Sequence, residues 1–316
     1  MTSFQPVILS EADVRSSMTR GDALKVVRDA FMAATAGTAR NFPVVREKLT
    51  GRVFGIKSAV DEARQVLGFK AGGAFPSNLA NGESAHQSSV MLIDFETGRV
   101  CAIVSGNHIT ALRTAAASAL SIDLLARPDV RSVGVVGAGA QAEAHIRAAL
   151  DVRGFEVVRI WSRSNSRAEH LAGSFKDTCE CEAISDLRSM IGLSDVVITL
   201  TPSTEPLIDN EWVRAGTHLA CMGADTAGKQ EVDVRLLTRA RVFTDDIEQS
   251  VTIGECQSAV RSGLLARRDI VGTLGDIMSG THAGRTRQDE ITLFDGTGVA
   301  LQDLFAAQFV LDRART

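Results

Sequence analysis

A glycine-rich segment, Gly137-Ala-Gly139-Ala-Gln-Ala142, has the residue types and spacing that bind the pyrophosphate of a dinucleotide. It follows the apolar run Arg131–Val136, a predicted strand, and precedes a predicted helix that ends near Val152. In this context backbone N–H groups gather at the start of a helix, where free donors and the helix dipole favour an anion. The alternative is an ordinary glycine-containing turn of another α/β protein. The context favours a dinucleotide site.

The end of the next predicted strand indicates which dinucleotide is bound. A carboxylate at this point accepts the ribose 2′-hydroxyl of NAD and repels the 2′-phosphate of NADP. The stretch Ile160–Arg167 contains no carboxylate and offers instead the side chains of Ser162, Arg163, Ser164 and Arg167. Guanidinium groups bind phosphate well, although exposed arginines are commonly solvated surface residues. We therefore expect NADP(H), with NAD(H) as the alternative.

Asp225 is the strongest candidate for proton transfer. It follows the apolar run His218–Met222 and Gly223, which predicts a position at the carboxyl end of a parallel strand. Open α/β sheets bind their ligands at that edge. A carboxylate there can hold an amino or iminium nitrogen and move its proton. The alternative is a loop aspartate that caps the next turn.

Composition and charge exclude several classes of partner. The formal net charge is −4 with no basic stripe, which argues against nucleic acid. No apolar run approaches the ~18 residues that span a bilayer, and residues 1–6 show neither the basic nor the apolar part of a signal peptide. The five cysteines form no C-x-x-C pair, which is typical of a reducing compartment rather than of a disulfide framework or a zinc site. We therefore expect a cytoplasmic protein with no metal.

Several common catalytic signatures are missing. The chain has no tyrosine, so a Tyr-x-x-x-Lys proton relay is excluded. It has neither the H-E-x-x-H spacing of zinc proteases nor the G-x-S-x-G elbow of α/β-hydrolases. Cofactor chemistry at the glycine-rich segment is the leading hypothesis.

Strands that alternate with helices must position these residues. At 316 residues the chain is long enough for about two domains. Its middle contains predicted strands at 131–136, 156–161, 195–200, 218–222 and 241–244, with predicted helices after the first two. This alternation predicts a doubly wound parallel sheet, the Rossmann arrangement. Beyond residue 287 the run 291–294 and the helix 300–311 no longer alternate in this way, and we expect both to pack on the N-terminal half.

The motifs resemble those of the ornithine cyclodeaminase/μ-crystallin family, which includes alanine dehydrogenases of this fold and cyclic ketimine reductases. The matching segments cover nearly the whole chain and are Gly68–Lys70, Phe75–Asn78, Ile109–Ala116, Gly137–Ala142, Gly223–Lys229, Asp289–Phe294 and Gly296–Gly298. The resemblance implies a mixed α+β substrate and dimerisation domain of residues 1–127 and 288–316. It also implies an inserted Rossmann domain of residues 128–287, and a homodimer.

The resemblance implies roles for individual side chains. Arg46 matches the family arginine that grips the substrate carboxylate, which a bidentate guanidinium does well. Lys70 matches the family lysine beside the same carboxylate and the reacting carbon. Its neighbours Phe69 and Ala71–Gly73 are apolar or small, a setting that lowers a lysine pKa toward neutrality, and the alternative is a surface lysine. Lys70 and Asp225 are the expected catalytic residues, and both are expected to bind the substrate with Arg46.

The expected cofactor contacts are spread along the chain. Arg113 lies in a predicted helix of small residues, where an arginine is expected to face the cofactor phosphates or the substrate. His86 matches a family position that contacts the cofactor in some members, although a lone histidine is as readily structural. The remaining expected contacts are Gly137, Ala138, Gly139, Gln141, Ser162, Arg163, Ser164, Arg167, Thr201, Met222 and Thr297. Asp295 departs from the family pattern, in which many members carry lysine.

The predicted reaction is NAD(P)H-dependent reduction of a cyclic ketimine carboxylate, Δ1-pyrroline-2-carboxylate or Δ1-piperideine-2-carboxylate, to an imino acid. The stretch Ser162–Ser164 and the length of 316 residues favour it, because by resemblance cyclodeaminases are typically longer and carry an acid there. Ornithine cyclodeamination and alanine dehydrogenation are the alternatives. Outside enzymes, the alternative is a NADPH-dependent binding protein of the μ-crystallin kind. The presence of both Lys70 and Asp225 argues against that alternative.

Overall fold

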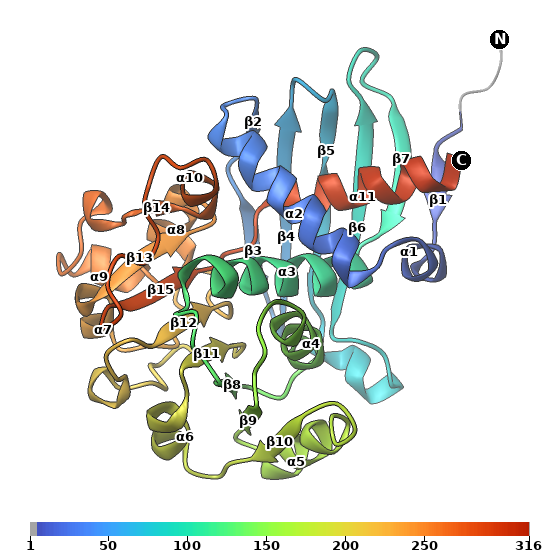
Figure 1. Cartoon of the computed structure of the whole chain (residues 1–316). Helices are drawn as coiled ribbons and strands as arrows, with labels where there is room; N and C mark the ends of the chain where they lie inside the picture. Colours follow the sequence, from blue (N-terminus) through green and yellow to red (C-terminus); the bar gives the residue numbers. More distant parts are fainter. Residues whose placement is uncertain (1–4, 316) are drawn as a thin grey trace. The chain divides into compact units, whose positions relative to one another are not determined.

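The computed structural model describes residues 5–315, which form two compact units (Figure 1). One unit contains the chain up to Arg113 together with the chain from Val299, and the other is Thr114–Gly298. The functional boundaries expected at 127/128 and 287/288 remain a prediction. Residues 1–4, which bear in part on the expectation about a signal peptide, lie outside the described residues.

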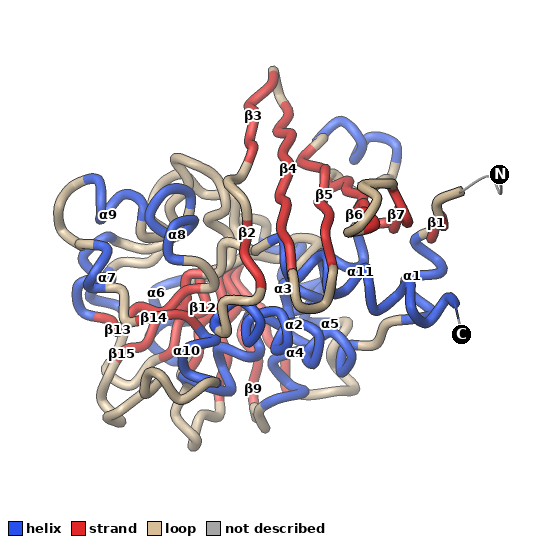
Figure 2. The backbone as a smooth tube through the Cα atoms, turned by 90° about the horizontal axis from the view of Figure 1, so that it is seen from above, coloured by secondary structure: helices blue, strands red, loops and turns tan. Residues whose placement is uncertain are grey.

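The first unit is built on a seven-stranded sheet. Its strands are β1 (Val7–Leu9), β2 (Ala39–Asn41), β3 (Val45–Leu49), β4 (Arg52–Asp61), β5 (Val66–Ala74), β6 (His86–Asp94) and β7 (Val100–Ser105). They lie in the order β1-β7-β6-β5-β4-β2, and β3 pairs with the other half of β4 as the hairpin seen in Figure 2. All pairs are antiparallel except β1 with β7.

Helices of this unit come from both ends of the chain. They are α1 (Glu11–Ser17), α2 (Arg20–Thr35), the short 3-10 helix η1 (Pro76–Asn81) and α11 (Ala300–Arg315). A capping box starts α1, because the Ser10 hydroxyl accepts the N–H of Asp13 and the Asp13 carboxylate accepts the N–H of Ser10. Helix α11 packs against α2, β4 and β5, so the last helix completes the N-terminal unit as expected (Figure 1).

The second unit is an eight-stranded sheet in which every pair is parallel, in the order β10-β9-β8-β11-β12-β15-β13-β14. Its strands are β8 (Ser132–Val136), β9 (Val157–Trp161), β10 (Glu180–Ala183), β11 (Val196–Thr199), β12 (His218–Cys221), β13 (Ala240–Thr244), β14 (Gly272–Thr273) and β15 (Ile291–Asp295). The chain leaves β8 toward β9 and later returns to its other side at β11. The carboxyl end of β8 is therefore the switch point where such sheets bind ligands. The predicted Rossmann sheet is confirmed.

The helices that connect these strands are mostly short. They are α4 (Ala142–Val152), α5 (Asn165–Gly173), α6 (Leu187–Leu193), α7 (Val234–Arg239), α8 (Ile247–Ile253), α9 (Gln257–Arg261) and α10 (Leu274–Met278), with 3-10 turns η2 (Asn210–Trp212) and η3 (Arg267–Asp269). Helix α3 (Asn107–Leu125) contains the boundary between the two units.

The expectation that the run 291–294 packs on the N-terminal half is wrong. Strand β15 lies inside the parallel sheet, where Leu293 pairs with Leu219 of β12 on one side and Val242 of β13 on the other. All five residues of β15 are buried. An apolar strand can lie between two consecutive strands from an earlier part of the chain, as β15 does between β12 and β13, whereas the alternation pattern relates only elements that follow one another.

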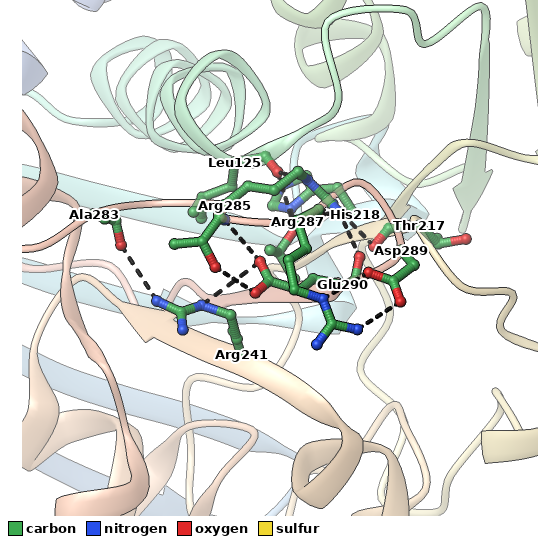
Figure 3. A network of polar contacts seen from close by, with 11 residues as sticks. Leu125, Thr217, His218, Arg241, Ala283, Arg285, Arg287, Asp289 and Glu290 are labelled. Carbon is green, nitrogen blue, oxygen red and sulfur yellow. Dashed lines mark hydrogen bonds and ion pairs between the residues drawn. The ribbon is translucent and has the colours of Figure 1, made fainter.

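A polar network holds the start of β15 in place (Figure 3). Arg285 donates to the carbonyl of Leu125 at 2.8 Å and to the hydroxyl of Thr292 at 2.9 Å. The ring of His218 lies 3.0 Å from the same hydroxyl, through Nδ1, and 3.2 Å from the hydroxyl of Ser121, through Nε2. Burial lowers the pKa of His218 to about 3, so this ring is neutral and serves the structure.

Candidate active site

The glycine-rich loop has the geometry that its motif predicts. Strand β8 ends at Val136, the backbone turns at Gly137 with a φ of 116°, and α4 begins at Ala142. A side chain at Gly137 is excluded by this φ and by the carbonyl oxygen of Leu200, which would lie 3.1 Å from a Cβ. A Cβ at Gly139 would meet no atom of the described residues within 4 Å. The loop therefore leaves open space at the residue that is expected to approach the phosphates.

A cavity of about 310 Å³ adjoins this loop, and its lining comes from the loop, α4 and α5. The lining residues are Ala138, Gly139, Ala140, Glu143, Ser166, Arg167, His170 and Leu171. The side-chain oxygen of Gln141 is buried without a hydrogen-bond partner among residues 5–315. An open cradle beside an unsatisfied acceptor fits the phosphates and a ribose hydroxyl of a dinucleotide.

The residues expected to choose between NAD and NADP follow β9. The hydroxyl of Ser162 accepts the N–H of Ser164 at 3.3 Å, which shapes the turn into α5. Arg163 and Arg167 are both exposed. Arg167 lines the cavity, whereas Ser162, Arg163 and Ser164 are not among its lining residues. Ser166 and His170 also line the cavity and were not predicted; they lie four residues apart on α5, on the same face of the helix.

Asp225 lies beyond the carboxyl end of β12, as predicted. Its carboxylate accepts the ammonium of Lys229 at 2.6 Å and the hydroxyl of Thr226 at 3.1 Å. Lys229 also donates to the carbonyl of Gly223 at 3.1 Å. Lys229 ends the motif Gly223–Lys229, and no role was predicted for it. In this arrangement Asp225 is held in a partly exposed ion pair.

Two other predicted cofactor contacts, Thr201 and Met222, follow β11 and β12. The backbone N–H and the hydroxyl of Thr201 donate to one carboxylate oxygen of Glu231, at 2.6 and 2.7 Å. Met222 is buried directly after β12. Glu231 was not predicted. In the sequence it is an acidic residue shortly after the apolar run His218–Met222, and no motif assigns it a function.

Thr297 and Asp295 belong to a buried acidic region at the end of β15. Thr297 donates its N–H and hydroxyl to Asp245, at 3.1 and 2.7 Å, so its hydroxyl is engaged within the unit. Asp295 accepts the hydroxyl of Ser250 at 2.6 Å and the N–H of Cys256 at 3.2 Å. Burial raises the pKa of Asp295 to about 7.

The first unit contains a buried ionic cluster around Lys70. The ammonium of Lys70, on β5, lies 2.8 and 2.9 Å from the two carboxylate oxygens of Asp303 and 3.3 Å from the hydroxyl of Thr110. Arg113 donates to the same carboxylate at 3.0 Å and to Gln302 at 3.0 Å. Burial and the charge of Arg113 lower the pKa of Lys70 to about 8, in the direction expected. Asp303 and Gln302 were not predicted.

Arg46 and His86 lie elsewhere on the same sheet. Arg46 is on β3, and its side chain crosses Gly55, where a Cβ would lie 3.2 Å from the arginine Cδ. The charge of Arg46 contributes, as the smallest of five causes, to the lowered pKa of Lys70. His86 begins β6 opposite Ala74, and its N–H donates to the Ser84 hydroxyl at 3.2 Å.

No helix within residues 5–315 is long and apolar enough to cross a bilayer. The same residues contain no group of three or more histidine, cysteine, aspartate or glutamate side chains arranged to hold a metal.

The parallel sheet with its switch point, the glycine-rich loop and the carboxylate beyond β12 define a Rossmann-type dinucleotide-binding protein. More narrowly, the chain belongs to the ornithine cyclodeaminase/mu-crystallin family, whose family model matches residues 4–316. The resemblance noted from the motifs is confirmed.

Named relatives cover almost the full chain. The iminosuccinate reductase of Paracoccus denitrificans is 43% identical over 312 residues, covering 98% of this chain and 97% of the relative. Its crystal structure with NAD+ matches with a TM-score of 0.90 and 42% identity over 98% of this chain and 96% of that one. An archaeal alanine dehydrogenase dimer with bound NAD matches with a TM-score of 0.93 and 30% identity over 98% and 96%. The Δ(1)-pyrroline-2-carboxylate reductase of Paracoccus denitrificans is 32% identical over 314 residues, covering 98% and 97%.

Proposed function

We propose that this protein reduces an imine whose carbon carries a carboxylate, with a nicotinamide dinucleotide as the hydride donor. The observation that carries the proposal is the buried cluster of Lys70, Arg113 and Asp303, which presents ammonium and guanidinium groups in a chain that also has the dinucleotide loop. Iminosuccinate and Δ1-pyrroline-2-carboxylate, the compounds in the names of two relatives, are both imines next to a carboxylate. The cyclic ketimines expected from the sequence belong to this class.

The chain's own residues would bind, orient and move protons. Arg46 and Lys70 hold the substrate carboxylate and fix the orientation of the reacting carbon. Asp225 stabilises the protonated imine nitrogen, which makes the adjacent carbon electrophilic, and then exchanges a proton with the amine. The bound nicotinamide supplies the hydride to that carbon.

The substrate has two candidates within this class. Cyclic ketimine carboxylates are the first. An open-chain imine with two carboxylates is the second, favoured by the identity of 43% to iminosuccinate reductase.

A substrate panel tests both candidates. NADPH and NADH oxidation would be followed with Δ1-pyrroline-2-carboxylate, Δ1-piperideine-2-carboxylate, oxaloacetate plus ammonia, and pyruvate plus ammonia. We expect stoichiometric oxidation with at least one carboxylated imine. Formation of proline from ornithine with catalytic NAD and no reductant, together with negligible imine reduction, would replace this function by cyclodeamination.

For the cofactor we propose a preference for NADPH over NADH. The support is the lack of a carboxylate at 160–167 and the presence of Ser166, Arg167 and His170 around the cavity beside the glycine-rich loop. Ser162→Asp combined with Arg163→Ala should lower the NADPH/NADH preference at least about tenfold, since a charged hydrogen bond contributes ~1.5–3 kcal/mol. A wild-type enzyme that prefers NADH, as the NAD+ and NAD in the structures of two relatives would suggest, would contradict it.

We also propose that the chain forms a homodimer in the cytoplasm and that its functional domains are 1–127 with 288–316 and 128–287. The dimeric archaeal relative supports the first proposal. The five cysteines, all without a disulfide, are typical of a reducing compartment. Light scattering of the purified protein tests the dimer, and a monomeric mass would contradict it.

A further inference from the structure

The carboxylate of Glu231 is fully buried at the carboxyl ends of β11 and β12. One oxygen accepts the N–H and hydroxyl of Thr201, at 2.6 and 2.7 Å. The other accepts the hydroxyl of Thr199 at 2.5 Å and the N–H of Gly223 at 2.8 Å. Residues at the ends of two neighbouring strands therefore donate hydrogen bonds to the carboxylate of one side chain.

The two loops that leave these strands touch at Gly223. A Cβ at Gly223 would lie 2.2 Å from the carbonyl oxygen of Thr201 and 2.5 Å from the Cδ of Glu231. No side chain fits between the loops, so their separation is set by the Glu231 carboxylate and by the glycine. A buried carboxyl group that accepts from four donors holds them in a fixed arrangement, and the interaction is weakened when one donor is misplaced.

The backbone of Glu231 is held by a second buried carboxyl group, that of Glu255. Its N–H and that of Val232 donate to one oxygen of Glu255, at 2.8 and 2.7 Å. Gln230 donates to the same oxygen at 2.6 Å. The backbone that carries the Glu231 side chain is thus held in place by hydrogen bonds, as is required of a residue that aligns two loops.

We propose that Glu231 is a positioning residue for the nicotinamide end of the cofactor, which it serves by aligning the loops that carry Thr201 and Met222. The inference rests on the proposed function. The glycine-rich loop after β8 receives the phosphates, and the ends of β11 and β12 lie next along the same sheet edge. The affinity for a ligand that contains the nicotinamide should depend on Glu231, and the affinity for a ligand without the nicotinamide should not.

A matched control lies at the opposite end of the same sheet. The carboxylate of Asp195, before β11, accepts the N–H groups of Arg131 and Ser132 at 3.0 and 3.1 Å and the Ser132 hydroxyl at 2.9 Å. It joins the amino ends of β8 and β11 much as Glu231 joins the carboxyl ends of β11 and β12. Neutralising Asp195 tests the general effect of a lost structural carboxylate.

The experiment compares the binding of NADPH or NADH, whichever the wild type binds more tightly, with that of the matching ADP-ribose. The ADP-ribose keeps the phosphates and lacks the nicotinamide. In Glu231→Gln the amide donor faces N–H donors, so we expect at least about tenfold weaker binding of the complete cofactor. The affinity for ADP-ribose should stay within about twofold. Asp195→Asn should lower the Tm and leave the ratio of the two affinities unchanged.

Each outcome decides between explanations. Equal weakening of both ligands in Glu231→Gln, or no weakening, overturns the role proposed for Glu231. A wild-type protein that binds neither ligand overturns the proposed function, and this inference with it. If Glu231→Gln does not fold, Thr199→Val removes one hydroxyl donor with little change in shape. We then expect about threefold weaker binding of the complete cofactor only, and unchanged binding overturns the inference.

Discussion

The ammonium group of Lys70 lies between both carboxylate oxygens of Asp303, at 2.8 and 2.9 Å, although the two residues are 233 positions apart in the chain. Both side chains are buried, and Arg113 shares the same carboxylate at 3.0 Å. Asp303 opposes the two effects that lower the pKa of Lys70, namely burial and the charge of Arg113. The carboxylate therefore helps to keep the lysine charged near neutral pH.

Asp303→Asn should make the activity more sensitive to alkali. Lys70, with a pKa of about 8, would lose its negative partner and release its proton at lower pH. Since the charged lysine binds the substrate carboxylate, the alkaline limb of kcat/KM should move down by about one pH unit. Asp312→Asn, on the exposed end of the same helix, is the control. An unmoved alkaline limb in Asp303→Asn would contradict the role of Lys70.

Lys70 could be found from the sequence and Asp303 could not, for a physical reason. A motif identifies a residue from its sequence neighbours, and Lys70 stands in such a motif. Asp303 stands between Leu301 and Leu304 in a helix that pattern alone describes as apolar. A carboxylate inside a buried helix is itself a signal, because acids are seldom buried without a partner. That signal indicates that a partner exists but does not identify it.

The position of β15 shows a similar limit. The apolar pattern of Ile291–Asp295 predicts a buried strand, and the strand is there. The strands on either side of it are β12 and β13. The sequence pattern of β15 does not show which position in the sheet the strand occupies, because that depends on the three-dimensional arrangement of the other strands. Glu231 was missed for the same reason, since its four donors come from the ends of two strands.

Gly139→Val should abolish dinucleotide binding in a folded protein. A Cβ at this position would meet nothing within 4 Å in residues 5–315, so the fold tolerates a side chain. The branched side chain would occupy the path of the phosphates instead. Circular dichroism and a Tm within about 3 °C of the wild type, a shift of ~1 kcal/mol or less, would establish folding. Unchanged cofactor affinity in such a variant would show that the loop is not the site.

Asp295→Asn should stabilise the protein at alkaline pH. The pKa of Asp295 is raised from 3.8 to about 7 by burial, so its stabilising contribution is complete below about 3.8 and is lost as the pH rises through about 7. An asparagine stays neutral and its oxygen can still accept from Ser250 and Cys256.

Urea unfolding at pH 5 and pH 8 measures this effect. A one-unit change in pKa corresponds to ~1.4 kcal/mol and the pKa of Asp295 is raised from 3.8 to about 7, so the variant should gain on the order of 4 kcal/mol at pH 8 and clearly less at pH 5. Asp129→Asn, at an exposed position, controls for the loss of one surface charge. A variant that is equally destabilised at both pH values would show that Asp295 is needed in its ionised form.

Asp225 and Lys229 should act on the reaction as one unit. The lysine donates to the Asp225 carboxylate at 2.6 Å and to the Gly223 carbonyl at 3.1 Å, so it both orients the acid and supplies the adjacent positive charge. Asp225→Asn should lower kcat by about 10²-fold or more, in the range of a lost general acid–base group. Lys229→Met should lower kcat by about tenfold, because the carboxylate remains but loses its orientation.

The double variant tests whether the two residues are coupled. If Lys229 acts through Asp225, the double variant should be no slower than Asp225→Asn, since the lysine has no carboxylate left to orient. Lys229→Arg should recover most of the activity, and cofactor affinity should stay within about threefold of the wild type in every variant. Additive losses would make Lys229 an independent contributor to the reaction. Retention of more than about a tenth of kcat in Asp225→Asn would remove Asp225 from proton transfer and leave Lys70, with its lowered pKa, as the group to test next.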